Sequence, residues 1–269
     1  IINFYQPEEG FPLFDLRPEV DEITIDGEPT SVRSITIGED VSSMKIIEKK
    51  LPAGNHQVVI KNKFNYLVTF NVTSKTVRSA FWMSDLGDRR YLERYLPTNL
   101  EYDQYKISLD IKVLGTDKEH QLFTNGDTSE TAKNHWQITY PEYFNASSIF
   151  FHLMEKGARP QVNFNFNSID GRNIPVTIYT EQNIQLFKNE TVRVLRELEQ
   201  DYGPWPHEQL IVYGAGSGGM EYAGATRTSF RALGHELIHS YFARGVMPAR
   251  GNSGWIDEAV ASWRDSGYE

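Results

Sequence analysis

Residues 235–239 read His-Glu-Leu-Ile-His, and Glu258 follows His239 after 18 intervening residues. Residues four apart on a helix lie one turn above each other, so both imidazoles can reach one tetrahedral zinc ion. Glu236 lies about 100° round the helix from His235, where it can act as a general base on a metal-bound water without being a ligand. This stretch therefore predicts a helix that carries a hydrolytic zinc site.

A catalytic zinc site needs a third protein ligand and an open fourth position for water, and Glu258 is the candidate ligand. It lies in a predicted amphipathic helix from Trp255 to Trp263. The apolar residues on one side of this helix are Ile256, Ala259, Val260 and Trp263. We expect that side to pack against the first helix. The alternatives are two histidines on a helix surface and a Glu258 that belongs to a solvated face beside Asp257.

The composition of the whole chain excludes several kinds of partner and metal ligand. The 269 residues carry a formal net charge of -9, which argues against a nucleic-acid partner held by phosphate contacts. There are no cysteines, so disulfides, a thiol nucleophile and thiolate metal ligands are excluded, and a metal has to be held by His, Asp or Glu. The apolar runs are shorter than the ~20 residues that span a bilayer, so we expect no membrane segment.

The hydrophobic period changes near residue 180. Before it, short alternating runs separated by turn signals predict an antiparallel, β-rich domain. These runs are Ile23–Gly27, Val58–Ile60, Tyr66–Val72, Tyr105–Ile111, Gln161–Phe166 and Val176–Tyr179. After it, the pattern predicts a mixture of helices and strands. The helices are expected at Gln182–Gln200, Phe230–Ala243 and Trp255–Trp263, and the strands at Gln209–Tyr213 and Met220–Thr226. We therefore expect two domains, residues 1–180 and 181–269.

A second motif, Gly218-Gly219-Met220-Glu221-Tyr222, precedes the histidines. Glycines at a strand edge let a substrate backbone approach closely. A carboxylate just after them can accept a charge-assisted hydrogen bond from a substrate's terminal ammonium. By itself this stretch also reads as a glycine-rich turn.

Taken together, these motifs resemble the aminopeptidase N family of zinc metallopeptidases, and Trp255-Ile256-Asp257-Glu258-Ala259 is similar to that family's segment around the third ligand. The resemblance implies an α+β chain, with a β-rich saddle or sandwich domain followed by the first part of a thermolysin-like α/β domain. It implies one Zn²⁺ held by His235, His239 and Glu258, with Glu236 as general base. The substrates implied are peptides with a free amino terminus, whose ammonium binds Glu221 and whose backbone binds Gly218 and Gly219.

The chain departs from the family pattern at four points. Tyr222 stands where many members have Asn, Ala259 replaces the usual Gly, and the span from Glu221 to His235 is short. The family's transition-state tyrosine lies well beyond the third ligand, and Tyr268 is too near Glu258 to take that role. We therefore expect this chain to be the amino-terminal part of an aminopeptidase, with weak or no activity alone.

Other readings stay open at this point. One is a zinc peptidase of different specificity, a glycyl aminopeptidase or an endopeptidase. Another is a peptidase-like scaffold used for binding. The start at Ile1 favours a processed, exported protein, while a cytoplasmic protein fits the same sequence. The sequence leaves the oligomeric state and the side-chain preference of the substrate pocket open.

Overall fold

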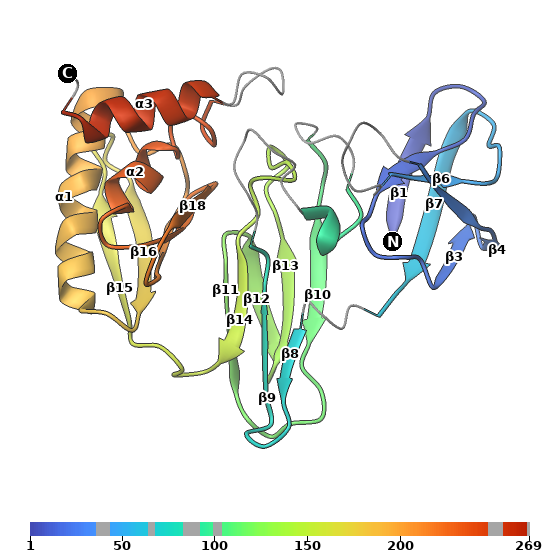
Figure 1. Cartoon of the computed structure of the whole chain (residues 1–269), viewed down its shortest axis with the longest axis horizontal. Coiled ribbons are helices and arrows are strands. Elements are labelled where there is room, and N and C mark those ends of the chain that lie inside the picture. The colour runs from blue at the N-terminus through green and yellow to red at the C-terminus, as the bar shows by residue number, and fades with distance from the viewer. Residues whose placement is uncertain (36–43, 64–67, 83–91, 99–103, 247–254, 268–269) are drawn as a thin grey trace. The chain divides into compact units, whose positions relative to one another are not determined.

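The computed structural model describes residues 1–35, 44–63, 68–82, 92–98, 104–246 and 255–267 (Figure 1). The chain divides into two compact units. The first comprises Ile1–Val68 with Tyr91–Glu101, and the second comprises Thr69–Arg90 with Tyr102–Glu269. The described residues include no helix that is long and apolar enough to cross a membrane.

The first unit consists of two small antiparallel sheets. One has the strand order β1 (Ile2–Gln6), β7 (Gly54–Lys61), β3 (Glu22–Ile25) and β4 (Glu28–Pro29); the other has the order β2 (Leu13–Asp15), β6 (Met44–Ile47) and β5 (Val32–Ile35). Alternate residues of these strands form its core: Phe14, Ile23, Ile25, Ile47 and Val58 are buried. A single 3₁₀ turn, η1 (Leu92–Arg94), closes the unit with Leu92 and Glu93 buried.

The second unit begins with two further antiparallel sheets. One has the strand order β11 (His120–Thr124), β14 (Phe151–Glu155), β9 (Thr76–Ala80) and β8 (Val68–Asn71). The other has the order β10 (Ser108–Lys112), β13 (His135–Thr139) and β12 (Asp127–Ala132). The strand predicted at Tyr66–Val72 is β8, although residues 66 and 67 lie outside the described residues. Several aromatic residues fill the interior, and Phe123 stacks on Tyr179 with ring centroids 3.7 Å apart.

A five-stranded mixed sheet then carries the helices. Its order is β15 (Gln161–Asn167), β16 (Asn173–Thr180), β17 (Leu210–Gly214), β19 (Ala225–Thr228) and β18 (Gly219–Tyr222). β16, β17 and β19 are parallel neighbours, while β15 and β18 are antiparallel edge strands. This sheet includes strands on both sides of residue 180, and the domain boundary predicted there stays a prediction.

Helix α1 (Ile184–Tyr202) connects β16 to β17 in the parallel part of the sheet. Asn183 caps it, because its side-chain oxygen accepts hydrogen bonds from the backbone N–H groups of Gln185 and Leu186, both at 3.1 Å. Its apolar face packs on the sheet together with α2 (Leu233–Ile238) (Figure 1). The predicted α+β class, rich in strands at its amino-terminal end, is confirmed.

Two predicted boundaries were wrong. The strand expected at Met220–Thr226 is a hairpin, β18 and β19, because Gly224 takes a φ of 62° and turns the chain between them. The helix expected at Phe230–Ala243 is regular only over Leu233–Ile238. Beyond it the amide of Tyr241 donates to the carbonyl of Ile238, three residues back, and the amide of Arg244 donates to that of His239, five residues back. The regular repeat of four residues is therefore interrupted, and among the described residues that follow the helix only Phe242 keeps it, through a 3.3 Å bond to Ile238.

Candidate metal centre

The two histidines lie at the carboxyl end of α2. His235 is within the helix, and His239 is the residue directly after it. Although the helix is short, one turn still separates them, and their ring centroids are 5.0 Å apart. His239 is buried and His235 is partly exposed. The two imidazoles therefore lie one helical turn apart, as predicted.

Helix α3 (Trp255–Asp265) brings Glu258 to these histidines, but by a different face from the one we predicted. Asp257 and Ala261 are its buried residues. Of the predicted apolar face, Ile256 and Trp263 are 49% and 50% exposed, and Ala259 is exposed as well. Val260 packs against the core that includes Leu233 and Leu237 of α2, so the prediction holds for this residue alone. Helical spacing identifies residues that share a face, and here the buried residues Asp257 and Ala261 lie on a different face from Ile256 and Trp263.

The three predicted ligands come together. Nε2 of His235 lies 3.2 Å from Oε2 of Glu258, and Nε2 of His239 lies 3.8 Å from Oε1 of the same carboxylate. One ligand atom from each of the three residues lies within 4.8 Å of the others. Ligand atoms of a tetrahedral zinc ion are about 3.3 Å apart, given bonds of 2.0–2.1 Å. The donor set and its spacing therefore fit zinc.

His235 has a further partner, Asp265, which was not among the predicted site residues. Its Nδ1 donates a hydrogen bond to Oδ2 of Asp265 at 2.8 Å, which leaves Nε2 facing Glu258. The hydrogen bond to Glu258 is the largest cause that raises the pKa of His235, to about 9, and Asp265 raises it further. A carboxylate behind a ligating histidine orients the ring and makes it a better ligand. Asp265 follows Glu258 by seven residues, so the helical repeat was the available signal.

His239 has a buried carboxylate behind it as well. Nδ1 of His239 lies 3.7 Å from Oδ2 of Asp257, and among the described residues neither atom has a hydrogen-bond partner. Burial lowers the pKa of His239 and raises that of Asp257 to about 6. Glu221, His239 and Asp257 form a second group with metal-ligand spacing. It shares His239 with the first group, so the two are alternatives.

The predicted base, Glu236, points from α2 toward the edge strand β18. A Cβ added to Gly219 would lie 1.9 Å from its Oε1 atom. Since no side chain can occupy that space together with the carboxylate, the structure brings Gly219 and Glu236 into direct contact. Gly218 precedes it with a φ of 67°, in the left-handed region that favours glycine.

Glu221 on β18 is buried, and its carboxylate already has a partner. Nη2 of Arg244 lies 2.7 Å from Oε1 of Glu221, and the side chains are 0% and 2% exposed. The same guanidinium donates to the backbone carbonyl of Glu221 and to Oγ of Ser147. Arg244 was not predicted as a site residue, because it follows the histidine motif by five residues and no local pattern in the sequence signals its contact with Glu221.

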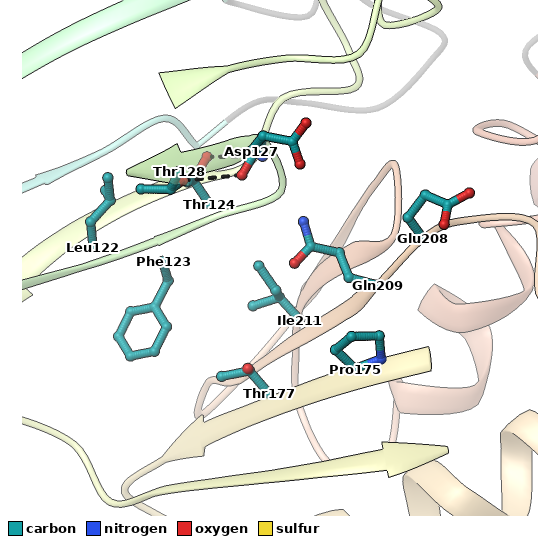
Figure 2. Close-up of a pocket in the computed structure, with 11 residues that line it drawn as sticks. Leu122, Phe123, Thr124, Asp127, Thr128, Pro175, Thr177, Glu208, Gln209 and Ile211 are labelled. Carbon is teal, nitrogen blue, oxygen red and sulfur yellow. Dashed lines mark hydrogen bonds between the residues drawn. The ribbon is translucent and has the colours of Figure 1, made fainter. Parts of the chain in front are cut away.

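A separate cavity of about 410 Å³ lies in the second unit, away from these residues. Figure 2 shows Thr124, Asp127 and Thr128, where β11 ends and β12 begins, facing Ile211 on β17 of the five-stranded sheet and Gln209 directly before that strand. None of the predicted ligands, nor Glu236 or Glu221, lines it. The candidate metal centre is therefore the cluster at α2, α3 and β18.

Solved structures with this arrangement of strands and helices include zinc metallopeptidases. An M1 zinc metallopeptidase from Deinococcus radiodurans is 16% identical, with a TM-score of 0.63 over 99% of this chain and 66% of its own. A two-domain M1 zinc metallopeptidase bound to L-arginine is 15% identical, with a TM-score of 0.62 and the same coverage. Leukotriene A4 hydrolase from Saccharomyces cerevisiae is 15% identical, with a TM-score of 0.59 over 86% of this chain and 38% of its own.

The fold is thus that of the M1 zinc metallopeptidases, which confirms the resemblance predicted from the motifs. At these identities the likeness is one of fold. No family model and no curated protein matches the chain. The chain spans 66% of the length of the M1 structures named above.

Proposed function

We propose that this chain is the zinc-binding part of an aminopeptidase that hydrolyses the amino-terminal peptide bond of peptides. The observation that carries the proposal is the convergence of His235, His239 and Glu258 from two helices, with ligand atoms within 4.8 Å of one another. The fold likeness to M1 zinc metallopeptidases supports it. One such neighbour is a variant from Deinococcus radiodurans bound to a Tyr-Ser-Ala substrate, 16% identical with a TM-score of 0.58.

In this proposal zinc, Glu236 and the two glycines each have a separate role in the hydrolysis. Zinc, when bound, would polarise the scissile carbonyl and lower the pKa of a water molecule. Glu236, which is 6% exposed and lies against Gly219, would take the proton of that water and pass it to the leaving amine. Gly218 and Gly219 would present backbone groups of the edge strand to an extended substrate.

Glu221 would accept the α-ammonium of the substrate. Its Oε1 atom is held by Arg244, which leaves the other carboxylate oxygen for this contact. Binding of the free amine next to the scissile bond would restrict hydrolysis to one residue at a time from the amino end.

The same ion pair favours a second candidate function. Because Arg244 already compensates the charge of Glu221, the site could act without a free amine, as in a zinc endopeptidase. Peptides with a free and with an acetylated amino terminus distinguish the two. An aminopeptidase loses the acetylated substrate, whereas an endopeptidase cleaves both.

The test of the proposed mechanism is the Glu236→Gln variant of the zinc-loaded full-length protein. Gln keeps the shape of the side chain but cannot accept the proton of the water, so turnover should fall by at least about a hundredfold. Zinc content should be unchanged, since Glu236 is not one of the three ligands. Full turnover by this variant would refute the mechanism.

A further inference from the structure

Arg264 on α3 links two helices through carboxylates. Its Nη2 atom lies 2.6 Å from Oε1 of Glu197 on α1, and its Nη1 atom lies 3.3 Å from Oδ1 of Asp265. The Arg264 side chain is 10% exposed, while Glu197 and Asp265 are 30% and 47% exposed, so the arginine lies inside and its partners lie toward the surface. The other oxygen of Asp265 accepts the hydrogen bond from His235. A continuous series of charged contacts therefore runs from α1 through α3 to a predicted zinc ligand.

Gly234, the residue before His235, makes room for this arginine. A Cβ on Gly234 would lie 2.3 Å from Nη1, 2.8 Å from Cζ and 2.9 Å from Nη2 of Arg264. The guanidinium is thus laid against the backbone of α2 itself. Glycine is a poorer helix former than alanine, and its φ here is not positive, so the backbone alone does not require it. Glycine is required at this position because Arg264 occupies the space that a side chain would need.

We propose that Arg264, which packs against Gly234 and forms an ion pair with Glu197, is a positioning residue for the zinc site. It acts through Asp265, whose carboxylate it holds in the orientation that bonds Nδ1 of His235. The inference rests on the proposed function, because it takes His235 as a zinc ligand. Its physical basis is that partners behind a ligating histidine set the orientation and basicity of the ring, and typically change metal affinity by about 10- to 100-fold.

The competing explanation is that Arg264 only fastens α3 to α1. Metal affinity and fold stability separate the two explanations. The Arg264→Gln variant removes both ion pairs, and we expect its zinc dissociation constant, measured by competition with a chromophoric chelator, to rise about tenfold. The matched control is Arg193→Gln. Arg193 pairs with the same Glu197, at 2.9 Å, and with Glu190, at 2.7 Å. In this control zinc affinity should stay within about twofold of the wild type.

The Gly234→Ala variant tests the contact between Gly234 and the Arg264 guanidinium without changing any charge. The added Cβ would displace the guanidinium, so a role only in fastening α3 to α1 predicts lower thermal stability with unchanged zinc affinity. A positioning role predicts in addition a zinc affinity about tenfold weaker, together with a changed visible spectrum of the cobalt-substituted protein. This variant keeps the test decisive even where Arg264→Gln does not fold.

A double-variant cycle checks the path through Asp265. In the Asp265→Asn background, Arg264→Gln should change zinc affinity by less than about twofold, because the intermediate contact is already lost. Additive losses would overturn the inference, as would wild-type affinity in both Arg264→Gln and Gly234→Ala. If the wild-type protein itself binds no stoichiometric zinc, the proposed zinc site is refuted, and the role of Arg264 with it.

Discussion

Asp265 lies directly behind His235, with its Oδ2 atom 2.8 Å from Nδ1 of the imidazole. This contact fixes which nitrogen of the ring faces Glu258, because Nδ1 carries the hydrogen that Asp265 accepts. It also leaves Nε2 as the atom for a metal. The predicted site thus consists of ligands and of the carboxylates that orient them.

Removal of this orienting carboxylate should weaken zinc binding without removing a ligand. We expect Asp265→Asn to raise the zinc dissociation constant by about 10- to 100-fold. Equilibrium dialysis with zinc buffers measures it. Asp170→Asn, which breaks a surface contact with Arg172, serves as the control and should bind zinc as the wild type does. Equal affinity in Asp265→Asn and the control would contradict this assignment.

Zinc affinity should depend strongly on pH. The pKa of His235 is raised to about 9, first by the hydrogen bond to Glu258, so the metal-free protein holds a proton there at neutral pH. A ligating imidazole has to be neutral, and zinc therefore displaces that proton. Affinity should rise with pH by about tenfold per unit between pH 7 and 8.5, and level off above the pKa. A zinc titration at several pH values measures the slope, and a flat profile would be evidence against the shifted pKa.

Gly219 should matter for turnover rather than for folding. A side chain at this position would displace the flexible Glu236 carboxylate, which a Cβ would approach to 1.9 Å. We expect Gly219→Val to lower kcat at least about tenfold, because small displacements of a catalytic group are costly. The control is Gly216→Val, since no atom lies within 4 Å of a Cβ on Gly216. Steady-state kinetics of the full-length enzyme compares them, and equal kcat values would rule out the contact.

The buried pair of Glu221 and Arg244 should contribute to stability. Arg244→Met leaves the Glu221 carboxylate buried without its cation, and we expect the free energy of unfolding to fall by about 3–5 kcal/mol. Arg33→Met, which breaks a solvent-exposed pair with Glu48, should cost less than about 1 kcal/mol. Urea denaturation monitored by circular dichroism measures both. Similar losses in the two variants would mean that the buried pair contributes no more to the free energy of unfolding than the exposed pair does.

The part of the site that local spacing determines could be predicted from sequence. His235, Glu236 and His239 follow from one helical turn, and Glu258 follows from the need for a third ligand. Long alternating or periodic segments were also predicted correctly, such as α1 and β15. In these cases the residues that decide the structure are neighbours in the chain.

What could not be predicted depends on contacts between distant segments. Arg244 pairs with Glu221 across 23 residues, and Arg264 reaches Glu197 on another helix. The buried residues of α3 are Asp257, which faces His239, and Ala261, so the apolar pattern of Ile256 and Trp263 pointed to the wrong side. Burial of charged groups requires partners, and a single sequence does not reveal which partners the fold supplies.

The most direct test of the central claim is zinc binding in two sets of variants, because His239 belongs to two candidate groups. Zinc titration of the wild type should give one ion per chain. His235→Ala and Glu258→Gln should lose tight binding, while Asp257→Asn and Glu221→Gln should keep an ion bound. Loss of zinc in the second pair, with unchanged binding in the first, would place the metal at Glu221, His239 and Asp257 and contradict the site proposed for this protein.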